Sequence, residues 1–313
     1  ARSSLLLPFN NLGIIIVDEE HDTSYKQDDG VVYHARDMAI SRASIENIPI
    51  HLITSIPSIE TFNNIQNKKF RHFKIIKRYN DYPLPKTKII NLNIKKIKSG
   101  FIDLETIKLV KFFLDKNEQV LFFLNRRGYA PYLICKNCGY KQTCPNCSMY
   151  LTFHKSKNRA VCHHCSHEKE ISRTCKDKKN CDFIMYGPGV EKIFEEVIKI
   201  FPSNKVEIFS SDHMKRKDQT KSLFSRIMDN KVDILIGTQM ISKGFNFPKL
   251  NCIVVIDADF SGRGYDLRTT EKNIQLYHQL SGRAGRFSSD SLIIYQTLSP
   301  KDATLNELIK NNS

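Results

Sequence analysis

Gly13-Ile-Ile-Ile-Val-Asp-Glu-Glu-His21 joins an uninterrupted apolar run to four polar residues. A short apolar run of this kind is typical of a parallel strand that is buried on both faces of its sheet. Open parallel sheets carry their chemistry beyond the carboxyl ends of their strands, which is where these polar residues fall. The stretch therefore predicts a buried strand that presents Asp18 to His21 at a functional edge; a solvated turn is the alternative.

Strand-like and helix-like segments alternate beyond this run. The first series continues with helix-like Ala35 to Glu46, apolar Ile50 to Ile53, helix-like Ser58 to Asn67 and strand-like Phe73 to Ile76. Asp81-Tyr-Pro-Leu-Pro85 then breaks the pattern, because proline favours turns and ends regular elements. We expect residues 1–82 to belong to one α/β lobe and residues 83–100 to be a linker.

A second series predicts another lobe. Its strand-like runs are Gln119–Leu124, Phe183–Tyr186, Val206–Phe209, Asp233–Ile236, Cys252–Ile256 and Leu292–Tyr295, and a helix-like segment follows the second of them. Such alternation predicts an α/β fold with parallel sheets, and 313 residues exceed what one hydrophobic core usually serves. We expect the second lobe over residues 101–134 and 182–300, with a tail at 301–313.

Eight of the nine cysteines interrupt this lobe within residues 135–181. They form four pairs, which are Cys135 and Cys138, Cys144 and Cys147, Cys162 and Cys165, and Cys175 and Cys181. A Cys-x-x-Cys turn aims two thiolates at one tetrahedral metal ion, so the four pairs predict two structural zinc sites. A disulfide framework or a redox pair is the alternative, but the chain shows no secretory signal.

Chain length decides which cysteine pairs share an ion. The five residues between Cys138 and Cys144 are too few for the hairpin that brings two such turns together, whereas the fourteen between Cys147 and Cys162 suit a zinc ribbon. We therefore predict nested sites. The inner site takes Cys144, Cys147, Cys162 and Cys165, and the outer site takes Cys135, Cys138, Cys175 and Cys181. His163 or His164 could replace a thiolate, and Cys252, in an apolar run, is expected to be an inert core thiol.

Charge and hydropathy limit the classes of binding partner that we expect. Forty-eight Lys and Arg residues against 33 Asp and Glu give a net charge of +15, which favours a polyanion such as nucleic acid. A genome rich in A and T, which enriches Ile, Asn and Lys, is the alternative explanation. No apolar run reaches the roughly 18 residues that span a bilayer, so we expect a cytoplasmic protein without a membrane partner.

Two motifs suit nucleotide hydrolysis. In the acidic segment, one carboxylate could hold Mg²⁺ through water while its neighbour polarises an attacking water. In Gln279-Leu-Ser-Gly-Arg-Ala-Gly-Arg286, two guanidiniums lie three residues apart and the glycines allow close backbone approach. Arg283 and Arg286 could thus meet a transferring phosphoryl group; an exposed basic turn is the alternative.

Several segments together resemble the PriA family of primosomal replication-restart helicases, which are DEAH-type enzymes of superfamily two. They are Asp18-Glu-Glu-His21, Asp22-Thr-Ser-Tyr-Lys-Gln27, Tyr33-His-Ala-Arg-Asp37, Asn125-Arg-Arg-Gly-Tyr129, the eight cysteines, Gly237-Thr-Gln-Met240 with Lys243-Gly244 and Phe247-Pro248, and Gly282-Arg-Ala-Gly-Arg286. The resemblance covers nearly the whole chain in order. It implies two RecA-like lobes, the first incomplete, with the zinc insertion in the second, and an ATP-dependent 3′-to-5′ DNA helicase that acts in primosome assembly at stalled forks.

The resemblance also implies residue roles. Asp18 would organise Mg²⁺, Glu19 would activate water, and Glu20 and His21 would relay the nucleotide state. Residues for ATP are Asp18, Gly244, Arg283 and Arg286. Residues for DNA are Tyr25, Lys26, Tyr33, His34, Arg126, Arg127, Thr238 and Gln239, where aromatic stacking suits a sequence-blind grip on single strands; a stacked core is the alternative for Tyr25 and Tyr33. Expected partners are single-stranded and forked DNA, primosome proteins and single-strand-binding proteins.

The chain departs from the family pattern in three ways. It contains no G-x-x-x-x-G-K-[ST] phosphate loop, so we expect a chain truncated at both ends that needs an upstream polypeptide for that loop. Ile53-Thr-Ser-Ile-Pro-Ser58 replaces Gly-Ser-Ala-Thr-Pro-Ser and loses a hydroxyl at Ile56. Five residues separate Cys175 from Cys181, so the outer zinc site is expected to be the weaker. A non-enzymatic zinc module that binds DNA or primosome partners is the alternative function.

Overall fold

The computed structural model describes most of the chain in two compact units, residues 1–76 and 77–313. The described residues are 2–75, 78, 81–92, 100–125, 132–135, 140–147, 151–154, 159–162, 165–170, 183–187, 189–210, 217–239, 247–259 and 268–310. Within these ranges, no helix combines the length and the apolar character needed to cross a bilayer.

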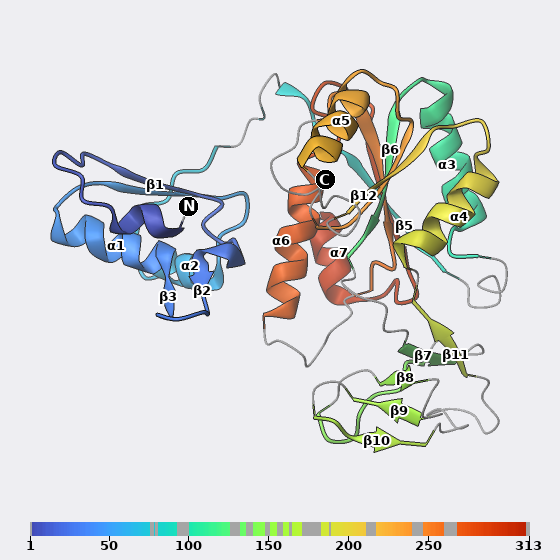
Figure 1. Ribbon diagram of the computed structural model, residues 1–313, viewed down its shortest axis with the longest axis horizontal. Coiled ribbons are helices and arrows are strands. Elements are labelled where there is room, and N and C mark those ends of the chain that lie inside the picture. The colour runs from blue at the N-terminus through green and yellow to red at the C-terminus, as the bar shows by residue number, and fades with distance from the viewer. Residues whose placement is uncertain are drawn as a thin grey trace. The chain divides into compact units, whose positions relative to one another are not determined.

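The first unit is built on two parallel strands. They are β1 (Ile15–Asp18) and β4 (Ile50–Ile53), in register with Ile15 opposite Ile50. The other elements are 3₁₀ turns η1 (Arg2–Leu6) and η2 (Thr23–Tyr25), a hairpin of β2 (Lys26–Gln27) and β3 (Tyr33–His34), and helices α1 (Ala35–Ile45) and α2 (Ile59–Gln66) (Figure 1). Helix α1 packs on the strands through small buried residues, Ala35, Ala39 and Ala43, which allow the helix to approach closely.

Two expectations for the first unit were wrong. Phe73 to Ile75 do not form a strand, and both Phe73 and Ile75 are more than four-fifths exposed; Ile76 lies outside the described residues. An apolar run forms a strand only where another strand pairs with it, which periodicity does not reveal. The strand β1 is also not buried on both faces, because Ile16 is 59% exposed and Ile53 of the neighbouring strand is 50% exposed.

The second unit contains a six-stranded parallel sheet. Its strand order is β12 (Val206–Phe209), β13 (Ile234–Gly237), β6 (Gln119–Leu124), β14 (Leu250–Ile256), β15 (Leu292–Thr297) and β5 (Lys86–Asn91). Every residue of the three strands β13, β6 and β14 is buried. Continuous apolar strands of this kind are expected where helices cover both faces of a sheet.

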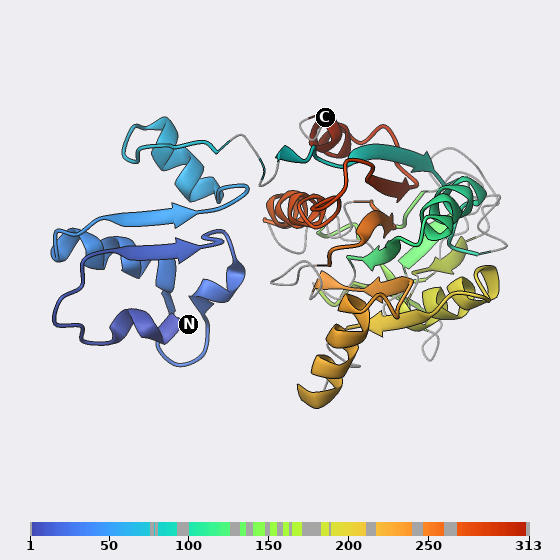
Figure 2. The same cartoon turned by 90° about the horizontal axis from the view of Figure 1, so that it is seen from above.

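Helices cover both faces of this sheet (Figure 2). On one face lie α3 (Leu104–Asp115) and α4 (Val190–Ile200), and on the other lie α5 (Lys217–Met228), α6 (Thr269–Ser281) and α7 (Ala303–Lys310). Side chains alternate between the faces along each strand. Phe122 packs in the cluster with Val110 of α3, while Phe123 packs in the cluster with Leu280 of α6. The predicted α/β fold class is thus confirmed for this unit.

The chain enters and leaves this sheet differently from our expectation. Lys86–Asn91, which we assigned to a linker, is the edge strand β5 and pairs in parallel with β15. Polar residues are common in edge strands, which are partly exposed to solvent. Because of them, the segment shows no apolar run from which a strand could be predicted. The expected tail contains α7, whose Leu305 and Leu308 are buried in the core.

The cysteine-rich module is a separate antiparallel sheet of the second unit. Its order is β10 (Glu168–Lys169), β9 (Arg159–Val161), β8 (Thr152–His154), β7 (Tyr132–Cys135) and β11 (Phe183–Tyr186). We had placed β11 in the parallel sheet, but it pairs antiparallel with β7, with Phe183 opposite Cys135. An apolar run does not specify which sheet it joins. The pairing of β7 with β11 makes the neck of the module.

Two polar side chains, the first of them fully buried, fix the start of α3. Gln296, fully buried on β15, accepts hydrogen bonds from Asp103 N (2.8 Å) and Thr106 Oγ1 (2.7 Å) and donates to Phe101 O (3.0 Å). The Glu196 carboxylate of α4 accepts from Phe101 N at 2.8 and 2.9 Å. These bonds satisfy backbone groups that a helix start leaves unpaired.

We expect Gln296→Met to destabilise the second unit by about 2–4 kcal/mol, because a backbone amide, a buried hydroxyl and a carbonyl lose their partner. Urea unfolding followed by circular dichroism measures the change. Lys108→Met, on the exposed side of α3, introduces the same side chain and should leave the midpoint nearly unchanged. Equal midpoints for both variants would show that the Gln296 bonds contribute little.

Candidate nucleotide, nucleic-acid and metal sites

The acidic segment follows β1 directly, as the sequence predicts. Asp18, the last residue of β1, is exposed, and its Oδ1 accepts a hydrogen bond from Glu19 N at 3.0 Å. Glu19 has a φ of 50°, a left-handed conformation that residues other than glycine adopt rarely and that recurs at functional sites. The Glu19 side chain remains 38% exposed, so both of these carboxylates can be reached from solvent.

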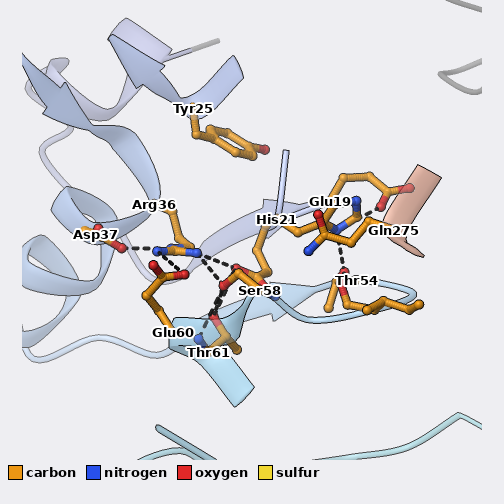
Figure 3. Close-up of polar contacts among 12 residues, drawn as sticks. Glu19, His21, Tyr25, Arg36, Asp37, Thr54, Ser58, Glu60, Thr61 and Gln275 are labelled. Atoms are coloured by element: carbon orange, nitrogen blue, oxygen red, sulfur yellow. Dashed lines mark hydrogen bonds and ion pairs between the residues drawn. The ribbon is translucent and has the colours of Figure 1, made fainter. Parts of the chain in front are cut away.

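Glu20, in contrast, is completely buried. Its carboxylate accepts hydrogen bonds from Ser58 N (2.7 Å), Ser58 Oγ (3.0 Å), Thr61 Oγ1 (3.0 Å) and Arg36 Nη1 (3.0 Å). The three donor residues lie close together (Figure 3). A buried charge of this kind is tolerated only when it is paired and fully hydrogen-bonded. Glu20 therefore fixes the end of β1 against the start of α2 and leaves Asp18 and Glu19 as the accessible carboxylates.

Arg36 is the cation that makes this burial possible, and the sequence analysis did not identify it. Its Nε donates to Asp37 Oδ1 at 2.8 Å, and its Nη1 also donates to Ser58 Oγ at 2.5 Å. Burial lowers the pKa of Arg36, but the hydrogen bonds to Asp37 and Glu20 outweigh it and raise the pKa above its ordinary value. The signal in the sequence was an arginine on a helix face otherwise made of alanines.

His21 contacts the segment that departs from the family pattern. Its Nδ1 lies 2.7 Å from Thr54 Oγ1, whose own proton goes to Ile56 O at 2.6 Å. Because the hydroxyl hydrogen is already committed, Nδ1 of His21 must be the donor, which fixes the tautomer of a neutral ring. The loss of a hydroxyl at Ile56 therefore leaves a hydroxyl contact in place, since Thr54 provides it (Figure 3).

Four residues expected to contact DNA lie in and beside the small hairpin. Lys26 is opposite His34 and Gln27 is opposite Tyr33 in the β2–β3 register. Tyr25, just before β2, donates from its hydroxyl to Asp18 O at 2.6 Å. Burial raises the pKa of Tyr25, and the negative charge of Asp18 raises it further. The hairpin is thus attached to the strand end that carries the acidic segment.

The arginine motif forms a turn directly after α6. Arg283 N donates to Leu280 O at 2.9 Å, and Arg286 Nε donates to Gly282 O at 2.9 Å. Burial lowers the pKa of Arg286. Gly285 has a φ of +63°, and a Cβ there would lie 2.2 Å from Ser291 Oγ. This position therefore requires glycine for both its conformation and its closeness to β15.

Arg78 supports this turn, and the sequence analysis missed it. Its Nη2 donates to Ala284 O at 3.3 Å and Gly282 O at 3.4 Å, while its Nη1 donates to Pro83 O at 2.8 Å. Burial lowers the pKa of Arg78, and the positive charge of Arg286 lowers it further. The backbone of the arginine turn is therefore held from the segment that leads into β5.

The other strand ends bring polar residues together. Gln239, after β13, donates from Nε2 to Asn125 Oδ1 at 3.3 Å, and Asn125, after β6, donates from Nδ2 to Asn273 Oδ1 of α6 at 2.8 Å. These contacts link the Thr238–Gln239 segment to the helix that leads into the arginine turn. Arg126, Arg127 and Gly244 lie outside the described residues.

The four cysteines of the predicted inner site lie together. All four sulfur atoms are within 4.8 Å of one another. The measured separations are 3.5 Å for Cys144 and Cys165, 3.3 Å for Cys147 and Cys162, and 3.6 Å for Cys147 and Cys165. None of these four sulfurs is part of a disulfide bond. Four thiolates around a tetrahedral ion with bonds of about 2.3 Å would be separated by about 3.8 Å, so the cluster fits zinc after a small expansion.

Tight turns present these sulfurs. Cys162 N donates to His167 O at 2.8 Å, Ser166 N donates to Cys162 O at 2.9 Å, and Ser166 has a left-handed φ of 58°. Of the predicted outer set, Cys135 is buried on β7, while Cys138, Cys175 and Cys181 lie outside the described residues, as do His163 and His164. Cys252 is fully buried and burial raises its pKa strongly, which accords with an inert core thiol.

Comparisons with known proteins agree with this arrangement. Residues 156–288 match the family model of the helicase conserved C-terminal domain. The yeast protein Dbp5 L327V, in its structure with RNA and ADP BeF3, aligns with 98% of this chain and 59% of its own at a TM-score of 0.50 and 11% identity, which shows the fold alone.

Relatives with higher sequence identity share the name replication restart protein PriA. Replication restart protein PriA of Rickettsia felis is 43% identical over 302 residues, which are 96% of this chain and 47% of the relative. The PriA of Haemophilus influenzae is 38% identical over 99% of this chain and 42% of its own length, and that of Bacillus subtilis is 35% identical over 96% and 38%. The chain thus spans between 38% and 47% of the length of these curated relatives. Nearly the whole chain therefore matches one part of the PriA proteins, at 35–43% identity.

Proposed function

We propose that this chain is part of an ATP-dependent 3′-to-5′ DNA helicase that acts in the cytoplasm in primosome assembly and the restart of stalled replication forks. The observation that carries the proposal is that two adjacent glutamates differ in burial and hydrogen bonding. Glu20 is buried and held by four hydrogen bonds, whereas Glu19 is left accessible in a left-handed conformation. The similarity to PriA proteins supports the DNA substrate and the biological setting.

In this proposal the acidic segment performs the hydrolytic chemistry. The exposed Asp18 carboxylate would hold Mg²⁺ through water, which suits a cation that keeps several waters. The Glu19 carboxylate accepts a proton from the attacking water, as general bases do in phosphoryl transfer. Glu20 and Arg36 hold the acidic segment in place. His21 transmits the state of the bound nucleotide to Thr54, with which it is in contact. Bound Mg²⁺ would neutralise charge on the phosphate oxygens.

The arginine turn and the hairpin supply charge and contact. Arg283 and Arg286 bind phosphate oxygens of the nucleotide. Burial lowers the pKa of Arg286, but arginine ordinarily titrates far above neutral pH and stays positively charged. Tyr25, Lys26, Tyr33 and His34 contact single-stranded DNA, where aromatic faces stack on bases. Because the tyrosine hydroxyl bonds to Asp18 O, DNA on this hairpin can influence the acidic segment.

We also propose that the cysteine-rich module holds two zinc ions. The inner ion is bound by the four clustered thiolates, and the outer ion by Cys135 with Cys138, Cys175 and Cys181. The pairing of Cys135 with Phe183, two residues after Cys181, supports an outer ion at the neck. Primosome and single-strand-binding proteins are the expected protein partners, together with a polypeptide that supplies the phosphate loop.

DNA-stimulated ATP hydrolysis tests the enzymatic proposal. The chain is assayed alone and combined with the preceding part of a PriA relative, which carries the phosphate loop. We expect hydrolysis in the combination. Zinc and DNA binding without hydrolysis in either condition would reject the enzyme and favour a DNA-binding zinc module, which the thiolate cluster and the net charge of +15 support as the second candidate.

In the hydrolysing combination, we expect Glu19→Gln to lower turnover about 100-fold or more, because an amide cannot accept the proton from water. Nucleotide affinity, measured with a fluorescent analogue, should stay within about twofold, since the amide keeps the size of the side chain. Glu195→Gln, an exposed residue of α4, is the matched control and should hydrolyse like the parent. Retained turnover in Glu19→Gln would remove Glu19 from the mechanism.

We expect Cys144→Ser to lose one zinc ion of about two per chain, because the weaker alcohol ligand replaces a thiolate at a closed site. Since structural zinc contributes folding free energy on the order of 10 kcal/mol, the module should also become sensitive to protease. Atomic absorption and limited proteolysis measure the two effects. Cys252→Ala, which changes the core cysteine, should keep the parent zinc content; unchanged zinc in Cys144→Ser would contradict the inner site.

A further inference from the structure

A buried ion pair joins the cysteine-rich module to the parallel sheet. Lys141 Nζ lies 2.8 Å from Asp259 Oδ2, and the two side chains are only 8% and 4% exposed. Lys141 belongs to the module, whereas Asp259 follows β14 at the carboxyl edge of the six-stranded sheet. A buried pair is very different from one at the surface, because removing one partner leaves an uncompensated charge away from water.

On the sheet side, Asp259 organises the end of β15. Its Oδ1 accepts from Ser299 N at 3.1 Å and from Thr297 Oγ1, and its Oδ2 accepts from Leu298 N at 3.4 Å. Ser299 N also donates to Thr297 Oγ1 at 2.9 Å. The carboxylate thereby ties the segment after β14 to the loop that leads into α7. The ammonium group of Lys141, 2.8 Å away, places the opposite charge beside this carboxylate.

On the module side, the backbone around Lys141 is held by the turns that carry the thiols. Lys141 forms a β-bridge with Ile134, next to Cys135. Cys135 N donates to Tyr140 O at 2.8 Å, and Leu151 N donates to Gln142 O at 2.9 Å. Cys144 follows three residues after Lys141. The position of the lysine therefore depends on how firmly these turns are held.

We propose that Lys141 and Asp259 form a metal-dependent latch, through which zinc binding in the module stabilises the loop between β15 and α7. The inference rests on the proposed zinc sites. Zinc holds the thiolate turns together, the turns hold Lys141, and Lys141 neutralises Asp259. Loss of zinc releases the turns, and the carboxylate is then left without its cation. The bonds from Leu298 N and Ser299 N to this carboxylate open more often as a result.

Ion pairs at the surface of the same unit cannot act as such a latch. Lys116 and Asp290 lie 2.6 Å apart, but their side chains are 41% and 50% exposed. Water and salt replace most of the attraction in such a pair, so its loss is nearly neutral. Lys116→Met thus removes the same kind of contact as Lys141→Met without leaving a buried charge, and it serves as the matched control.

Hydrogen exchange of the 313-residue chain, followed by mass spectrometry with and without zinc, tests the latch. In the parent chain we expect removal of zinc by a chelator to speed exchange of the Leu298 and Ser299 amides about tenfold or more, and zinc addition to restore it. In Lys141→Met these amides should exchange fast even with zinc bound, and zinc removal should add little. Lys116→Met should respond like the parent.

A double variant covers the case in which Lys141→Met does not fold. Lys141→Met with Asp259→Asn leaves no buried charge, and replacement of both partners of a buried pair is often tolerated. We expect this variant to fold and bind zinc as the parent does, but its Leu298 and Ser299 exchange should not respond to zinc. An undiminished response in this variant would overturn the latch.

The outcomes separate the latch from the zinc sites on which it rests. If the parent chain does not bind zinc by atomic absorption, the proposed metal sites are rejected. If it binds zinc but exchange at Leu298 and Ser299 is the same with and without the metal, the latch alone is rejected. The latch is also rejected if zinc removal speeds exchange equally in the parent and in Lys141→Met.

Discussion

A carboxylate buried at the end of a parallel strand must be neutralised and hydrogen-bonded, and both units of this chain are organised around that requirement. In the first unit, Glu20 after β1 receives Arg36 and the hydroxyls at the start of α2. In the second unit, Asp259 after β14 receives Lys141 and the donors after β15. In each case the charge cannot be satisfied locally, so the strand end is attached to a segment distant in the sequence.

The same requirement separates supporting residues from those that we propose to be reactive. Among the acidic residues after β1, the buried Glu20 is fully hydrogen-bonded, while Asp18 is exposed and the Glu19 side chain is 38% exposed. The arginine turn repeats this division, because Arg78 holds its carbonyl groups and leaves the turn to present Arg283 and Arg286. Rigid support of this kind reduces the reorganisation that a charged transition state would otherwise demand.

The sequence predicted what depends on local pattern and spacing. Strands β4, β6 and β12 begin and end where the apolar runs do, and loop length alone placed the four inner thiols together. The sequence did not predict the polar edge strand β5, the antiparallel pairing of β11 or the unpaired run at Phe73. The spacing of apolar residues does not show which strands pair with each other. Arg36, Arg78 and Lys141 were missed for a related reason: each acts through a tertiary contact with a residue or a backbone carbonyl far along the chain.

The uncovered side of the first unit has a practical consequence. Ile14 and Ile16 at β1 and Ile53 of β4 together leave aliphatic side chains in water, and α1 does not relieve this because it lies on the opposite side. Exposed apolar patches of this kind favour association with any surface that removes them from water. Concentrated solutions of the isolated chain are therefore prone to form soluble clusters, and measurements on monomers call for dilute samples and mild detergent.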